Sequence, residues 1–188
     1  MFKKKIILGS GSPRRKELIQ NLKIPFEVKT QPVDEVFPVD LACEDVAEYL
    51  ANLKAQPLKS LLKENEVLLT ADTVVIQNNK VLGKPKDEAE ALEMIKNLSN
   101  SEHQVITGVN MTSLDKSISF SSSTKVVFKE LSDEEMMFYV KEFKPFDKAG
   151  AYGIQEWIGQ IGISKIEGCF YNVMGLPVSM VWEKLKKF

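Results

Sequence analysis

The sequence predicts a mixed α/β protein, and three features of the chain predict it. Strand-like and helix-like stretches alternate, beginning with an apolar run at residues 6–8 that leads through small residues into a helical pattern. Residues 66–77, EVLLTADTVVIQ, form the clearest strand, because β-branched and apolar side chains dominate them. Turn residues at 78–79 and near 115–116 separate pairs of strands, which indicates hairpins. We therefore expect one mixed, twisted sheet with helices around it.

Each further element has its own local signal. Asp87 with Glu90, and Ser132 with Glu135, have the spacing of capping boxes, so a helix should begin after each pair. Pro57 should interrupt or restart the helix before it, because proline has no backbone N–H. In chain order we expect a strand at 4–10, a helix at 13–22, strand plus loop at 24–38, a helix at 44–55, strands at 66–77 and 80–85, a helix at 87–98, two strands within 103–130, a helix at 133–143, glycine-rich strand-like pieces at 150–168, and a final helix opened by Pro177.

Composition limits the possible functions. The chain has 188 residues and a formal net charge of −1, so no overall basic field recruits nucleic acid. Cys43 and Cys169 are too few and too far apart for a disulfide framework or a zinc motif. The apolar run near the N-terminus is too short for a signal peptide, and no stretch has the length of a transmembrane helix. We expect a cytoplasmic protein with residues 1–188 in a single domain.

The small-residue loop at 9–12 and the basic residues after it suggest an anion site. Cations are unfavourable in the first turn of a helix, yet Arg14 and Arg15 stand there. Backbone N–H groups, the Ser10 hydroxyl and two forked guanidinium groups would suit phosphate oxygens. The stretch lacks the G-x-x-x-x-G-K-[ST] pattern of a P-loop. The alternative is an ordinary helix start with solvated arginines.

Asp72 is the most unusual carboxylate in the sequence, because it interrupts the apolar strand 66–77. A carboxylate there must be paired, act as a base or bind a metal, or else it lies at a strand end and satisfies a nearby turn. Asp34 and Glu35, in a proline-flanked loop, could help hold a divalent cation, with solvated acids as the alternative. Lys54 and Lys84, taken singly, are typical of surface lysines.

The segment FDKAGAYGIQ, residues 146–155, combines small residues with Gln155. Small residues allow a ligand to approach closely, and a glutamine amide offers both a donor and an acceptor to the edge of a base. A tight loop of structural glycines is an equal competitor. His103 has no nucleophile motif beside it, so we interpret it as structural.

Nine stretches in order give the sequence a close resemblance to the Maf family of nucleoside triphosphate pyrophosphatases. They are SGSPRRKEL (10–18), VDE (33–35), LANLKA (50–55), ADTVV (71–75), VLGKP (81–85), LSNSEHQVITGV (98–109), TKVVF (124–128), DKAGAYGIQ (147–155) and IEGCFYNVMGLP (166–177). The DKAGAYGIQ stretch is similar to the branch of this family that acts on dTTP and UTP. Glu156 and Trp157 depart from the glycine that many relatives carry after this glutamine.

The resemblance implies a Maf/ITPase-like fold in two lobes around a nucleotide-binding cleft, and hydrolysis of the triphosphate to monophosphate and pyrophosphate. It implies a divalent cation, Mg²⁺ or Mn²⁺, near Glu35, and Asp72 as the proton acceptor that activates water. Asp72 could bind the cation instead. By position in the matching motifs, Arg14, Thr73 and Gln155 are implied in substrate selection, and Ser10, Arg15, Lys54 and Lys84 in phosphate binding.

The expected partner is therefore a nucleoside triphosphate, with no nucleic acid and no membrane, and a homodimer is an open expectation. Two alternatives remain at this point. One is a pyrophosphatase for purine nucleotides such as ITP or XTP, and the other is a nucleotide-binding regulator of cell division that does not turn the nucleotide over.

Overall fold

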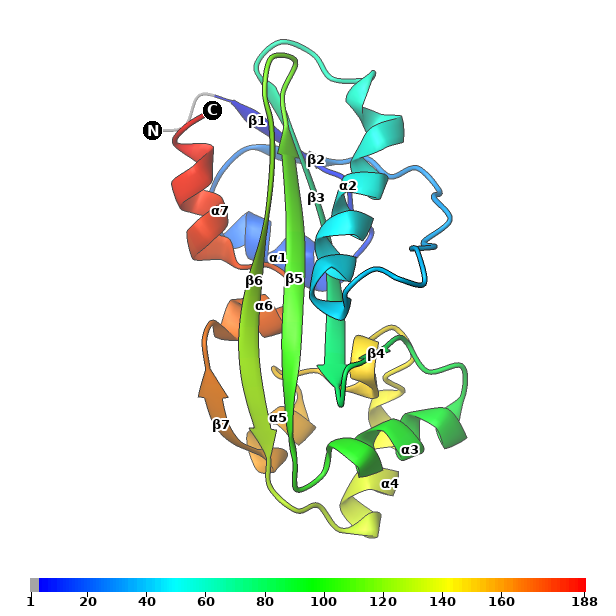
Figure 1. Cartoon of the computed structure of the whole chain (residues 1–188). Helices are drawn as coiled ribbons and strands as arrows, with labels where there is room; N and C mark the ends of the chain where they lie inside the picture. The colour runs from blue at the N-terminus through cyan, green and yellow to red at the C-terminus, as the bar shows by residue number, and fades with distance from the viewer. Residues whose placement is uncertain (1–3) are drawn as a thin grey trace. The chain divides into compact units, whose positions relative to one another are not determined.

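The computed structural model describes residues 4–188, which contain seven strands and seven α-helices (Figure 1). The N-terminal start of the sequence considered for a signal peptide lies partly in residues 1–3, outside the described residues. The strands are β1 (Lys5–Leu8), β2 (Phe26–Val28), β3 (Glu66–Gln77), β4 (Lys80–Leu82), β5 (Glu102–Thr112), β6 (Ser117–Phe128) and β7 (Ile163–Glu167). The helices are α1 (Pro13–Asn21), α2 (Val46–Lys59), α3 (Glu88–Leu98), α4 (Asp133–Phe143), α5 (Trp157–Gly162), α6 (Phe170–Met174) and α7 (Val178–Leu185), with short 3₁₀ helices η1 (Cys43–Asp45) and η2 (Ala149–Ala151).

The strands form a mixed sheet in the order β2-β1-β3-β5-β6-β7, with β4 paired to β3. β1 pairs in parallel with both β2 and β3, so that Leu8 lies opposite Val28 on one side and Leu69 on the other. The hairpin partner β4 and the late strand β7 pair antiparallel, with β3 and β6 respectively. The fold class predicted from the sequence is confirmed.

The described chain divides into two compact units, and long strands contribute to both. The first unit contains Met1–Thr73, Thr107–Ser122 and Gly175–Phe188, and the second contains Val74–Ile106 and Ser123–Met174. Figure 1 traces β3, β5 and β6 as the longest strands, and the unit boundaries fall inside each of them. The prediction of one domain over residues 1–188 stays a prediction, and each unit is described by itself below.

In the first unit, α2 packs its apolar stripe against the sheet. Ala55 and Leu58 of this helix form a buried cluster with Ile7 of β1 and Leu68 of β3. A Cβ atom at Gly108 of β5 would lie 2.2 Å from the backbone nitrogen of Glu48, so only glycine permits this approach of strand and helix. Burial of each such leucine or isoleucine contributes about 1.5–3 kcal/mol. The position of α2 therefore depends on core packing.

In the second unit, the two predicted helix starts are confirmed. The Asp87 side chain accepts a hydrogen bond from the Glu90 backbone nitrogen at 2.8 Å. Ser132 and Glu135 form a complete capping box at the start of α4. These side chains satisfy backbone N–H groups that have no partner inside the helix.

Two local expectations were wrong. Helix α2 runs through Pro57 to Lys59 without a break. The proline removes one backbone hydrogen bond, and the burial of Leu58 beside it in the core favours the helical conformation. Residues 157–162 form α5, although their glycines suggested strand-like pieces. A Cβ atom at Gly159 would lie 1.9 Å from the Ile154 carbonyl oxygen, so tertiary contact requires the glycine that makes this helix hard to predict. Within residues 4–188, none of the helices is both long and apolar enough to cross a membrane.

Candidate functional site

A pocket of about 450 Å³ lies in the first unit beside the Gly9–Ser10–Gly11 loop. Residues 30–33 and the side chains of Glu35 and Lys54 also line it. Gly9 is required at its place, because a Cβ atom there would lie 2.6 Å from Thr70 Cγ2. The loop between β1 and α1 thus presents small residues and backbone to the pocket, as predicted for an anion site.

Helix α1 begins directly after this loop. Ser12 is its N-cap and accepts from the Arg15 backbone nitrogen at 3.4 Å, and Pro13 occupies the first turn. The first turn contains no acidic residue. The partial positive charge of the α1 N-terminus and the cationic side chains of its first turn therefore reinforce each other.

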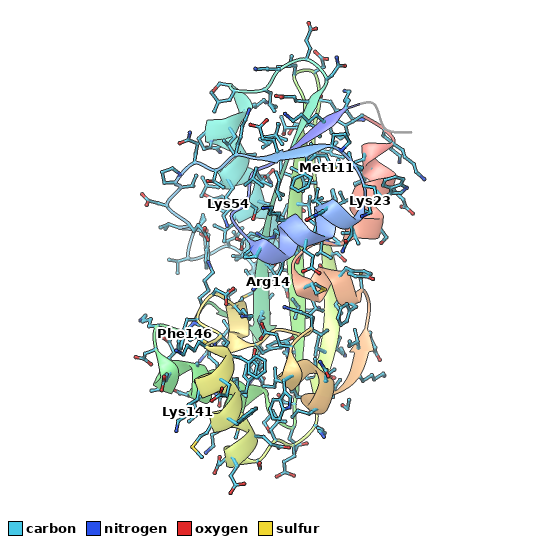
Figure 2. All side chains as sticks on the ribbon, turned by 180° about the vertical axis from the view of Figure 1, so that it is seen from behind. Arg14, Lys23, Lys54, Met111, Lys141 and Phe146 are labelled. Carbon is cyan, nitrogen blue, oxygen red and sulfur yellow. The ribbon has the colours of Figure 1, made fainter. Side chains whose placement is uncertain are left out.

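Lys54, Asp72 and Glu35 come together from three different elements. Lys54 of α2 contacts Asp72 Oδ1 of β3 through its ammonium group, and the same nitrogen lies 3.0 Å from Glu35 Oε1 in the loop before η1. Figure 2 labels Lys54 on α2. The Asp72 side chain is 11% exposed and Glu35 is 45% exposed, so one carboxylate is enclosed and the other reaches solvent. The structure thus brings together three residues to which the family resemblance gives roles in one site, and those roles stay predictions.

Arg15 is buried, and its guanidinium is held from three sides. Nε donates to the Gly175 carbonyl oxygen at 2.8 Å, Nη1 to Ser10 Oγ at 3.2 Å and Nη2 to Thr73 Oγ1 at 2.9 Å. Burial lowers the pKa of Arg15, and the negative charge of Asp72 opposes this effect. Arg14, which Figure 2 labels on α1, is half-buried, and Lys16 is exposed. The basic turn therefore combines one inward arginine with more accessible cations.

The two hydroxyl groups that Arg15 contacts, those of Ser10 and Thr73, each have a second hydrogen-bond partner. Ser10 Oγ accepts from Arg15 and also from the Ser12 backbone nitrogen at 3.3 Å, so both lone pairs are used and its O–H is left to donate. Thr73 Oγ1 also lies 2.9 Å from Thr107 Oγ1 of β5. Sequence reasoning did not single out Thr107. Its only signal was its place in the LSNSEHQVITGV stretch.

Lys84 and Gln155 belong to the second unit, where backbone contact joins their segments. The Gly150 nitrogen donates to the Gly83 carbonyl oxygen at 3.0 Å, and Lys84, which follows Gly83, is exposed. Gly150 has φ +68°, a left-handed conformation, with Val75 side-chain atoms 3.0 Å from the position of a Cβ atom. Gln155 is half-buried, and its Oε1 atom is enclosed without a hydrogen-bond partner among residues 4–188.

The family profile described as Maf-like protein matches residues 5–188. The chain belongs to the Maf-like family. The family prediction made from the nine motifs is confirmed.

Among curated Maf-like relatives, a protein of Christiangramia forsetii is named dTTP/UTP pyrophosphatase and is 51% identical over 182 residues, covering 97% of this chain and 93% of its own. A Bacteroides thetaiotaomicron protein of the same name is 48% identical over 186 residues, covering 98% and 96%. The solved structure of the Staphylococcus aureus Ham1 protein is similar in fold, with a TM-score of 0.50 and 16% identity over 98% of this chain and 99% of that one.

The donor set of the Maf-like pocket fits a magnesium-type cation bound together with a substrate. Within the described part of the chain, no three His, Cys, Asp or Glu side chains are grouped as metal ligands. Asp72 and Glu35 instead offer a pair of carboxylates that share Lys54. Mg²⁺ commonly uses one or two carboxylates and completes its shell with phosphate oxygens and water.

The one histidine of the sequence, His103, is not among the residues that line this pocket. His103 is 4% exposed in the second unit, and its Nε2 lies 2.7 Å from Tyr152 Oη. Its ring stacks on Phe128 at a centroid distance of 5.6 Å. Burial lowers the pKa of His103 to about 4. This environment is that of a neutral core histidine.

Proposed function

We propose that this Maf-like protein is a nucleoside triphosphate pyrophosphatase that hydrolyses dTTP and UTP to the nucleoside monophosphate and pyrophosphate. The observation that carries the proposal is the contact of Lys54 with both Asp72 and Glu35 at the pocket beside the Gly9–Gly11 loop. Relatives of about half identity over nearly the whole chain bear the name dTTP/UTP pyrophosphatase, which supports the substrate class.

In the proposed reaction, Asp72 accepts a proton from the attacking water. The water oxygen forms a bond to the α-phosphorus, and the bond from that phosphorus to the α–β bridging oxygen breaks, so pyrophosphate leaves. The proton resides on the Asp72 carboxylate until it passes to solvent. One positioned carboxylate is a sufficient base, because this chemistry depends mainly on charge stabilisation and orientation.

Lys54 links substrate binding to this step. Its ammonium contacts both Asp72 and Glu35. A triphosphate brings oxygens that compete for the same ammonium group, so the Asp72 carboxylate becomes available to water when the polyanion arrives. The Ser10 hydroxyl and Arg14 would donate to phosphate oxygens, and Arg15 adds charge while it orients Ser10 and Thr73.

We propose that Glu35, with Asp72 close to it across Lys54, would hold the divalent cation, Mg²⁺ or Mn²⁺. Such an ion supplies charge neutralisation at the phosphate oxygens. We also propose that Lys84 binds phosphate and that Thr73 and Gln155 select the substrate. The Gln155 amide suits uracil and thymine, because their N3–H is a donor beside a carbonyl acceptor, whereas cytosine presents an acceptor at N3.

Action in the cytoplasm and assembly as a homodimer are further parts of the proposal. No disulfide joins Cys43 and Cys169, which agrees with a reducing compartment. Size-exclusion chromatography with light scattering would decide between monomer and dimer.

A product-resolved assay in ¹⁸O-water tests the function. Wild-type protein with Mg²⁺ should convert dTTP or UTP to the monophosphate and pyrophosphate, with the label in the monophosphate. Nucleoside diphosphate and orthophosphate, or label in pyrophosphate, would contradict the proposed bond cleavage. Faster turnover of ITP or XTP would favour a purine enzyme, and tight binding with no product under any metal would favour a regulator.

A further inference from the structure

Gln155 sits inside a tight turn whose two ends are joined by a backbone hydrogen bond. The Glu156 nitrogen donates to the Gly153 carbonyl oxygen at 3.0 Å. Two glycines are required for this packing, because a Cβ atom at Gly153 would lie 2.7 Å from Glu156 Cδ and one at Gly159 would meet the Ile154 carbonyl. The turn is thus packed against the Glu156 side chain on one side and α5 on the other.

The phenol of Tyr139 binds both ends of this turn. Tyr139 is fully buried on α4. Its Oη accepts from the Gly153 nitrogen at 3.0 Å and donates to Glu156 Oε2. Burial, reinforced by the Glu156 carboxylate, raises the pKa of Tyr139, so the phenol keeps the proton that it donates. One hydroxyl group therefore contacts the residues on both sides of Ile154 and Gln155.

The second oxygen of Glu156 extends the network to the start of the same segment. Glu156 Oε1 lies 3.0 Å from Lys148 Nζ, and that ammonium lies 2.7 Å from Asp147 Oδ1. The Lys148 side chain is 10% exposed, so the ion pair is largely shielded from water. Residues 147–156 are consequently held at their beginning and at their end by one set of side chains.

The side chain of Gln155 is half-buried and carries an unsatisfied acceptor. Its Oε1 is enclosed and has no hydrogen-bond partner within residues 4–188. A buried acceptor without a donor is unfavourable, and such an arrangement persists only when its surroundings hold it in place. The network of Tyr139, Glu156 and Lys148 supplies that hold.

We propose that Glu156 and Tyr139 are positioning residues that fix the Gln155 amide for selection of the base. The proposal rests on the proposed function, because Gln155 selects a base only if the protein acts on nucleotides. Loss of this clamp, formed by Tyr139 and Glu156, should loosen selection between bases more than it slows turnover.

The activity test compares dTTP with dCTP in wild type, Tyr139→Phe and Glu156→Gln. We expect the ratio of kcat/KM values, dTTP over dCTP, to fall about tenfold in Tyr139→Phe, mostly through a higher KM for dTTP. Glu156→Gln keeps an oxygen for Tyr139 and loses only the ion pair, so its ratio should fall less. Tyr152→Phe is the matched control, because it removes a buried phenol that contacts His103 rather than the turn. An unchanged ratio in Tyr139→Phe, or an equal loss on both substrates, overturns the proposal.

A second measurement does not depend on activity. NMR-detected hydrogen exchange should show faster exchange of the Gly153 and Glu156 amides in Tyr139→Phe, with no such change in Tyr152→Phe. Unchanged protection of both amides would overturn the clamp even in an active enzyme. If wild type hydrolyses neither dTTP nor UTP, the proposed function fails, and the exchange rates still decide whether the clamp exists.

Discussion

Lys54 in the first unit and Lys148 in the second each contact two carboxylates, yet the two clusters have different surroundings. Lys54 and Glu35 line a pocket, Lys54 also contacts Asp72, and the Glu35 side chain is 45% exposed. Lys148, with Asp147 and Glu156, adjoins a buried phenol that takes the remaining Glu156 oxygen. The same three charges therefore face a space for a ligand in one unit and a protein turn in the other.

This difference teaches that charge composition alone does not identify a site. Both lysines lie in stretches that resemble family motifs, LANLKA and DKAGAYGIQ. What distinguishes them is the hydroxyl group of Tyr139, which binds Glu156 in addition to the lysine, whereas Glu35 and Lys54 line a pocket. Oxygens already bound by Tyr139 hold a fold in place, whereas oxygens beside a pocket can bind a cation or water.

The largest expected effect is loss of turnover in Asp72→Asn. The amide keeps the shape of the side chain and cannot accept the proton of water, so kcat should fall by about 10³-fold. Asp147→Asn, the same substitution at an exposed carboxylate of the other cluster, should change kcat less than about threefold. Circular dichroism and thermal unfolding check that both variants fold. Full activity in Asp72→Asn would remove this residue from the mechanism.

The next effect is on stability and separates the two arginines of α1. Arg15→Lys should lower the free energy of unfolding by about 3 kcal/mol, because an ammonium cannot reach Ser10, Thr73 and Gly175 at once. Arg14→Lys, one residue earlier, should leave it within about 0.5 kcal/mol and raise the KM for dTTP. Urea unfolding gives the first quantity and steady-state kinetics the second. Equal stabilities of the two variants would contradict the tethering role of Arg15.

The contrast between these arginines also marks how far the sequence could lead. The fold class, the helix caps at Asp87 and Ser132 and the unusual place of Asp72 follow from local patterns, and the structure bears these out. That Arg15 turns inward does not follow, because its partner Gly175 is 160 residues away in the chain. Local sequence signals indicate which residues start a helix, but they do not indicate which distant residues its side chains contact.

Helix α5 and the Glu156 clamp show the same limit. Two glycines lower the helix propensity of residues 157–162, and the contact of Gly159 with Ile154 outweighs that preference. Tyr139 looks like an ordinary core residue of an amphipathic helix, and only the structure places its hydroxyl between Gly153 and Glu156. The residue roles carried over from the family resemblance at Lys84 and Gln155 stay predictions.

The free energy of unfolding should depend on pH through His103 in the second unit, which is the one histidine of the sequence. Its pKa is about 4 in the folded protein and near 6.5 in the unfolded chain. Between these values the unfolded chain binds a proton that the folded protein does not, so stability falls as the pH falls. The loss should reach about 2–3 kcal/mol between pH 6.5 and pH 4 and be absent above that range. Urea unfolding at several pH values measures this loss, and His103→Gln should make the free energy of unfolding nearly independent of pH in this range. If both proteins lose stability equally as the pH falls, groups other than His103 cause the loss.

The smallest effect tests whether the clamp acts locally or through the stability of α4 as a whole. Ser132→Ala removes the N-cap of this helix and should lower the free energy of unfolding by about 1 kcal/mol. Tyr139 lies about two turns further along, and its hydroxyl keeps both partners in this variant. The dTTP to dCTP ratio should therefore stay at the wild-type value, in contrast to Tyr139→Phe. A lowered ratio in Ser132→Ala would mean that the overall stability of α4, rather than the Tyr139 hydroxyl alone, determines the conformation of the 153–156 turn. The Ser132 hydroxyl binds the Glu135 nitrogen and not the turn.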